Sequence, residues 1–150
     1  MSAPDTPAGA MLEVRGLEAG YGAAQVLFGI DFAVAAGEVA TLIGRNGMGK
    51  TTTIRTVMGL MRPSAGTIHV RGRDMTQAEP FHLAKAGLGL VPEGRQVFPT
   101  LSVRENLVAT AANHSASGPS DEPRWTLESV FDLFPRLAER AGNLGSQLSG

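Results

Sequence analysis

Four residues in the stretch GRNGMGKTT have the types and spacing of a loop that binds phosphate groups. Gly44, Gly49, Lys50 and Thr51 complete the pattern G-x-x-x-x-G-K-[ST]. Glycines let a backbone wrap closely around an oxyanion with its N–H groups pointing inward, and a following helix presents its positive end to the same anion. The lysine supplies a point charge to the terminal phosphates, and the threonine hydroxyl is a ligand for Mg²⁺. The chain has eleven arginines and only two lysines, so a lysine at this position is not explained by a general preference of the sequence for lysine.

The candidate cofactor-binding residues, called here the glycine loop, are the consecutive residues Gly44, Arg45, Asn46, Gly47, Met48, Gly49, Lys50, Thr51 and Thr52. Within the loop, Lys50 is the candidate catalytic residue and Thr51 the candidate Mg²⁺ ligand. The alternative is that a glycine-rich turn merely joins a strand to a helix, with a solvated lysine beside it. The elements on either side of the loop favour phosphate binding.

A strand and a helix are expected to hold the glycine loop between them. The run EVATLIG at 38–44 is apolar without alternation, which predicts a strand buried on both faces. After Lys50, apolar residues recur at the helical spacing i, i+3, i+4 and i+7. The helix is expected to end around 59–63. Its predicted apolar face consists of Ile54, Val57, Met58 and Met61.

In the rest of the chain, short apolar runs alternate with glycine and proline residues that are typical of turns. Further strands are expected at 12–17, 28–34, 66–72 and 87–92, with a short helix near 79–86.

Two further helices are expected in the last third of the chain. Ser102 followed three residues later by Glu105 forms a capping box, which predicts a helix start. The polar segment 113–124 predicts a surface loop. A second amphipathic helix then carries Leu127, Val130, Phe131 and Phe134 on one face before Pro135 interrupts it.

Composition excludes several classes of protein. At 150 residues the chain has the size of one domain, and its net charge of −1 argues against nucleic acid as a partner. It has no cysteine, which excludes disulfides and cysteine metal sites and favours a reducing compartment. Residues 1–10 predict a flexible tail with no signal-peptide character, and no run is long enough for a membrane helix. No direct membrane insertion is therefore expected.

Four sequence motifs, taken in their order along the chain, resemble those of one protein family. They are AGYG at 19–22, GRNGMGKTT at 44–52, VPEGRQVFPTLSVRENL at 91–107 and LSG at 148–150. Over residues 11–150 the chain resembles the first part of the nucleotide-binding subunit of an ATP-binding-cassette (ABC) transporter. The third motif is similar to the corresponding segment in the second of the two ATPase subunits of branched-chain amino acid uptake systems.

The resemblance implies an α/β fold, a truncated ABC ATPase domain. It would consist of a P-loop NTPase core with an N-terminal antiparallel β subdomain over about 11–92, then a linking loop and the start of a helical subdomain over about 93–150. The chain ends inside the signature motif, so we expect the catalytic Asp-Glu strand and a later histidine to be absent from these residues. The full-length protein is expected to hydrolyse ATP and the 150-residue chain to be inactive by itself. His69, His82 and His114 are not expected to replace the missing histidine.

The resemblance also assigns roles to residues outside the glycine loop. Tyr21, the only tyrosine, would stack on adenine, although a tyrosine in a glycine turn is otherwise a surface or half-buried aromatic. Glu93 occupies the position of a glutamine that senses the γ-phosphate and reaches Mg²⁺, and it departs from the family in being a carboxylate. The alternative for Glu93 is a solvated loop residue, and Gln96, three residues away, is not assigned the role. Ser149 and Gly150 would cover the γ-phosphate bound to an opposite subunit.

The implied function is an importer ATPase that uses ATP and Mg²⁺ to take up branched-chain amino acids or related amides. Its partners would be a second ABC ATPase subunit, identical or paralogous, and transmembrane permease subunits, on the cytoplasmic face of the plasma membrane. Two alternatives stay open. Another P-loop enzyme, such as a GTPase or small-molecule kinase, would predict a guanine-reading N-K-x-D motif, which the sequence lacks. The other is a half-cassette that binds ATP without hydrolysis.

Overall fold

A computed structural model describes residues 9–94, 96–111 and 125–148. The chain divides into two compact units, with the boundary between Leu90 and Val91, and each is described by itself. The polar loop expected at 113–124 and the signature residues Ser149 and Gly150 lie outside the described residues, as does most of the expected tail.

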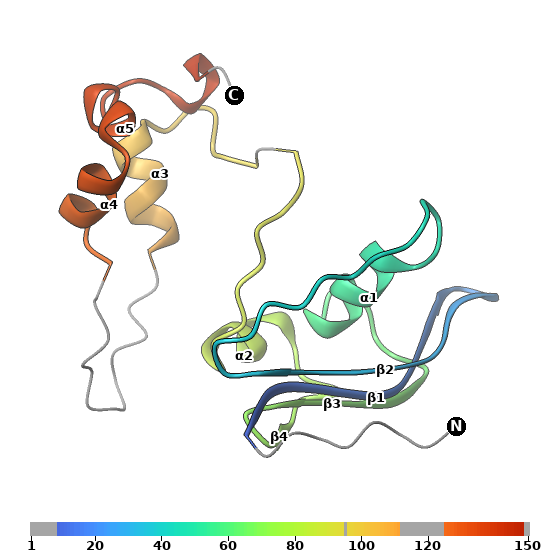
Figure 1. The fold of residues 1–150 in the computed structure, drawn as a ribbon. Coiled ribbons are helices and arrows are strands. Elements are labelled where there is room, and N and C mark those ends of the chain that lie inside the picture. Colours follow the sequence, from blue (N-terminus) through green and yellow to red (C-terminus); the bar gives the residue numbers. More distant parts are fainter. Residues whose placement is uncertain (1–8, 95, 112–124, 149–150) are drawn as a thin grey trace. The chain divides into compact units, whose positions relative to one another are not determined.

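The first unit is built on a four-stranded antiparallel sheet of order β2-β1-β3-β4 (Figure 1). A two-residue turn at 22–23 joins the two long strands into a hairpin. The strands predicted at 12–17, 28–34 and 66–72 are confirmed, and the first two are longer than expected. The bounds are β1 Ala10–Tyr21, β2 Ala24–Ala35, β3 Ala65–Val70 and β4 Arg73–Asp74.

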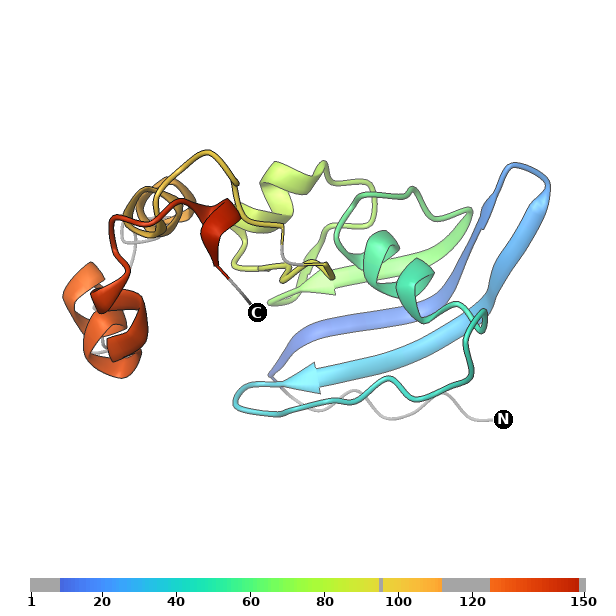
Figure 2. The ribbon, with the colours of Figure 1, turned by 90° about the horizontal axis from the view of Figure 1, so that it is seen from above.

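Two helices, α1 (Lys50–Val57) and α2 (Pro80–Lys85), lie on the same side of this sheet (Figure 1). Seen from above, α1 lies over the sheet, where it contacts β1 and β2 (Figure 2). The short helix predicted near 79–86 is thus confirmed. The buried apolar cluster between helix and sheet comprises Val14, Leu17, Ala19, Leu27, Val57 and Ile68.

The buried face of α1 differs from the predicted one. Its buried residues are Thr52, Thr53, Thr56 and Val57, whereas Ile54 is 43% exposed. Thr53 and Thr56 tolerate burial because their hydroxyls are satisfied locally: they donate to the carbonyls four residues earlier, at 3.0 and 2.8 Å. Apolar periodicity missed this face, because a threonine packs its methyl group while its hydroxyl bonds to the same helix.

The strands predicted at 38–44 and 87–92 are wrong. Both segments lack strand structure. Val39, Ile43 and Val91 are about nine-tenths exposed. A strand is stabilised by pairing its N–H and C=O groups with a neighbouring strand, and no described segment pairs with either run. An apolar composition alone therefore did not produce a strand here.

The described residues of the second unit include three short helices, α3 (Val103–Thr110), α4 (Leu127–Leu133) and α5 (Pro135–Glu139), followed by a 3₁₀ turn at Gly145–Gln147. The predicted capping box is confirmed, since the Ser102 hydroxyl accepts from Glu105 N at 3.2 Å and Glu105 Oε2 accepts from Ser102 N at 2.8 Å. The predicted amphipathic helix is α4, and Pro135 begins α5 as a first-turn proline.

The start of α3 is tied to the end of the described chain. Val103 N donates to Asn143 O at 2.9 Å, and Gly145 N donates to Leu101 O at 2.8 Å. Segments 97–104 and 141–146 are therefore neighbours within this unit. In the part of the chain that the structure describes, no helix combines the length and apolarity of a membrane span.

Candidate functional site

The glycine loop folds back on itself through a tight turn. Met48 N donates to Arg45 O at 3.3 Å, which closes a four-residue turn around Asn46 and Gly47. Gly47 has φ 82°, the left-handed value that the third position of a type II turn requires. The turn brings the two arms of the loop together, since a Cβ added to Gly44 would lie 3.7 Å from Met48 Cβ.

Gly49 is required at its position for two reasons. Its φ is 87°, which an L side chain adopts only at a cost. A Cβ there would also lie 2.8 Å from Leu27 Cδ2 and 3.4 Å from Val26 Cγ1, on strand β2. The loop therefore rests directly on the sheet at the residue before α1, which positions the start of the helix.

The ammonium of Lys50 lies within the glycine loop. Nζ donates to Gly44 O at 2.6 Å and to Arg45 O at 2.8 Å, and Lys50 is the first residue of α1. The first N–H groups of a helix have no partner inside it, and here the α-helical bonds begin with Thr53 N, which donates to Gly49 O at 2.8 Å. A positive charge and a helix N-terminus thus occur at one loop, which fits an anion such as a phosphate.

The threonines that follow the lysine differ in exposure. Thr51 is exposed, so its hydroxyl is accessible at the loop, whereas Thr52 is buried in the contact between α1 and the sheet. The described residues contain no group of three or more histidine, aspartate or glutamate side chains placed to hold a metal ion. The accessible hydroxyl of Thr51 is the side-chain oxygen that the loop itself could offer to Mg²⁺.

Tyr21 ends strand β1, opposite Ala24 in the hairpin. Its side chain is half exposed, at 51%. The hairpin is closely packed beside it, because a Cβ on Gly20 would lie 2.3 Å from Ala24 O. The ring is thus half exposed at the end of β1, beside the hairpin turn.

The remaining predicted site residues belong to the second unit. Glu93 is exposed in the segment that opens this unit and follows Pro92. Ser149 and Gly150 lie outside the described residues. The structure therefore brings together the residues from Gly44 to Thr51. Tyr21 belongs to the same unit as this loop, and Glu93 belongs to the other unit.

Two features of the site were missed from the sequence. The carbonyls of Gly44 and Arg45 hold the Lys50 ammonium, and Leu27 and Val26 support Gly49 from strand β2. The second contact joins residues more than twenty positions apart, and no local spacing could have revealed it.

Comparisons with known proteins agree with this geometry. The family model described as "ABC transporter" matches residues 27–150. The high-affinity branched-chain amino acid transport ATP-binding protein BraG of Pseudomonas aeruginosa is 35% identical over 130 residues, covering 87% of this chain and 54% of that protein. Nod factor export ATP-binding protein I of Paraburkholderia xenovorans is 35% identical over 141 residues, covering 94% of this chain and 45% of that protein.

A solved structure titled "Structure of ATP binding subunit of ABC transporter" superposes with a TM-score of 0.72 at 31% identity. The superposition covers 93% of this chain and 56% of that one. The chain thus spans about half the length of the relatives it matches. The expected α/β fold of an ABC ATPase domain and the resemblance to branched-chain amino acid transporter ATPases are confirmed. The chain belongs to the ABC transporter family.

Proposed function

We propose that the chain is the ATP-binding part of an ABC importer subunit that couples ATP hydrolysis to uptake of branched-chain amino acids or related amides. The observation that supports this most directly is the Lys50 ammonium held inside a glycine loop at the first residue of α1. Bound ATP with Mg²⁺ would supply the phosphoanhydride bond whose hydrolysis drives transport.

In this proposal the glycine loop binds the phosphates. The Lys50 ammonium exchanges its bonds to Gly44 O and Arg45 O for bonds to phosphate oxygens, at little geometric cost because it already lies at the loop. The first N–H groups of α1 donate to the same anion, and the exposed Thr51 hydroxyl is a ligand of Mg²⁺. The buried Thr52 acts through its packing and its backbone N–H.

Two residues outside the loop also have proposed roles in nucleotide binding. The half-exposed ring of Tyr21 stacks on adenine. Glu93 stands where family members carry a γ-phosphate-sensing glutamine, and its carboxylate would bind the metal more strongly than an amide does. Glu93→Gln in the complete protein tests this role: a higher Mg²⁺ requirement or a changed ATPase rate supports it, and no change in either removes it.

The proposed partners are a second ABC ATPase subunit, identical or paralogous, and transmembrane permease subunits at the cytoplasmic face of the membrane. Ser149 and Gly150 would contact the γ-phosphate held by the opposite subunit. We propose that the carboxylates and histidine for hydrolysis lie outside these 150 residues, so that the chain by itself binds ATP without turnover. Phosphate release by the 150-residue chain that depends on Lys50 would contradict this.

The substrate and direction are supported by the similarity to the P. aeruginosa protein named for branched-chain amino acid transport. A comparable identity to a protein named for Nod factor export makes an exporter the second candidate. Reconstitution of the complete transporter in vesicles separates the two, because an importer accumulates labelled leucine against its gradient only when ATP is on the side of the ATPase subunits. Export of a preloaded Nod factor instead would favour the second candidate.

The first test is ATP binding by the 150-residue chain and two lysine variants. The chain contains only two lysines, so Lys85→Ala is a matched control for Lys50→Ala. Lys85 lies on α2, where its ammonium is 5.6 Å from the centre of the Phe81 ring. We expect Lys50→Ala to weaken MgATP binding by about tenfold or more, as loss of a charge-assisted hydrogen bond implies. Equal binding by all three proteins would refute the proposed site.

A further inference from the structure

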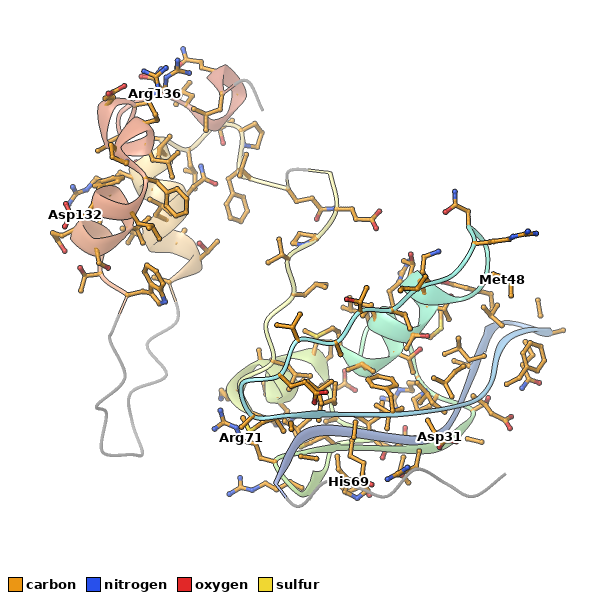
Figure 3. The ribbon with its side chains drawn as sticks, viewed as in Figure 1. Asp31, Met48, His69, Arg71, Asp132 and Arg136 are labelled. Carbon is orange, nitrogen blue, oxygen red and sulfur yellow. The ribbon has the colours of Figure 1, made fainter. Side chains whose placement is uncertain are left out.

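Met48 differs from the other methionines in the described part of the chain by its exposure. Its side chain is 71% exposed, whereas Met11, Met58, Met61 and Met75 are all partly buried. Figure 3 labels it at the loop that precedes α1. An oxidant in solution therefore reaches one described methionine sulfur much more easily than the others.

Met48 also belongs to the glycine loop rather than to an ordinary surface. It lies between Gly47 and Gly49, which have φ values of 82° and 87°, and two residues before Lys50. Its N–H donates to Arg45 O, the carbonyl that also accepts from the Lys50 ammonium. A chemical change at this side chain thus occurs within the hydrogen-bonded turn that holds the lysine.

We propose that Met48 is an oxidation-sensitive modification site that weakens nucleotide binding when it is converted to the sulfoxide, an inference that rests on the proposed function. Hydrogen peroxide transfers one oxygen atom to Met48 Sδ: the O–O bond breaks, an S–O bond forms, sulfur loses two electrons, and the remainder of the peroxide leaves as water. The thioether becomes a polar group whose oxygen is a strong hydrogen-bond acceptor. That oxygen competes with phosphate oxygens for the loop's donors and repels them.

The experiment treats the intact 150-residue chain with hydrogen peroxide and follows each methionine by peptide mass spectrometry. We expect Met48 to be oxidised several times faster than Met11, Met58, Met61 and Met75. A fluorescent ATP analogue with Mg²⁺ then measures binding, and its affinity is expected to fall by about fivefold as Met48 sulfoxide accumulates, the factor that repulsion between partial charges a few ångströms apart produces. Methionine sulfoxide reductases acting on both sulfoxide epimers are expected to restore it.

Two variants assign the effect to one sulfur atom. Met48→Leu cannot be oxidised at this position, so its affinity after peroxide is expected to equal its own affinity before peroxide. Met75→Leu keeps Met48 and removes another sulfur from the same unit, so it is expected to lose affinity as the unmodified chain does.

Oxidation of Met48 at the rate of the partly buried methionines overturns the proposal, as does unchanged binding by a chain fully oxidised at Met48. A loss of affinity in oxidised Met48→Leu equal to that of the unmodified chain also overturns it. Failure of the proposed function looks different, because the untreated chain then binds no nucleotide before any peroxide is added, and the inference falls with it.

Discussion

Alanine at Gly49 and at Gly47 separates the two roles of glycine in the loop. Both residues have left-handed backbone, with φ 87° and 82°. An L side chain there costs about 1–2 kcal/mol. Only at Gly49 would the new Cβ collide, 2.8 Å from Leu27 Cδ2, whereas at Gly47 it meets nothing within 4 Å. The two variants therefore share the backbone term and differ in the steric term.

The steric term is set by the buried position of Leu27, which is 1% exposed and belongs to the apolar cluster under α1. Crowding one methyl group into a packed core costs about 1–3 kcal/mol. We therefore expect Gly47→Ala to lower the free energy of unfolding by about 1–2 kcal/mol. Gly49→Ala is expected to lower it by about 2–5 kcal/mol, the sum of the two terms.

Urea unfolding followed by far-ultraviolet circular dichroism measures both values, provided that the dependence on urea concentration stays the same between variants. Equal decreases in the free energy of unfolding of the two variants would refute the contact between the glycine loop and β2. A Leu27→Val background sharpens the test, because a smaller side chain at position 27 is expected to reduce the excess cost of Gly49→Ala and leave that of Gly47→Ala unchanged.

Three further predictions concern stability. Hydrogen bonds from the Ser102 N–H and hydroxyl hold the pKa of Glu105 below its ordinary value. The folded state therefore loses stability as pH falls from the ordinary glutamate pKa through the lowered one. Ser102→Ala should make the free energy of unfolding depend less on pH in this acid range, which unfolding followed by Trp125 fluorescence measures. Arg71 has φ 50° in the β3–β4 turn, so Arg71→Asn should raise the unfolding free energy by about 0.5 kcal/mol in urea, and a decrease would contradict this. Asn106 Oδ1 accepts from Phe98 N, and its Nδ2, with two N–H donors, lies within hydrogen-bond distance of three carbonyls just before α3. Asn106→Ala should cost about 2 kcal/mol by the same fluorescence, with Asn106→Asp, which keeps only the acceptor, as the control.

Features with a local cause could be predicted from the sequence. The start of α1 at Lys50 follows from the glycine-lysine-threonine pattern, and the start of α3 follows from Ser102 and Glu105. Each depends on atoms a few residues apart, so the spacing along the chain is itself the geometry. The antiparallel strands were also recognisable, because their alternating or apolar runs are bounded by glycine turns.

Features that depend on partners distant in the sequence could not be predicted from it. The apolar run at 38–44 has the composition of a buried strand, yet Val39 and Ile43 are exposed because no described strand pairs with that run. Periodicity placed Ile54 on the buried face of α1, whereas the structure buries Thr56 there, with its hydroxyl bonded to the helix backbone. In both cases apolar composition indicated what a segment could bury but not which partner it would meet.

The candidate site divides in the same way. The sequence by itself determined that a lysine and two glycines at this spacing form an anion-binding loop at a helix start, since that property belongs to contiguous backbone. Only the tertiary structure decided that Gly49 rests on Leu27 and that the Lys50 ammonium is held by the carbonyls of Gly44 and Arg45. The contact at Gly49 depends on how the hairpin packs against the loop, and packing is a property of surfaces that meet only when the chain is folded.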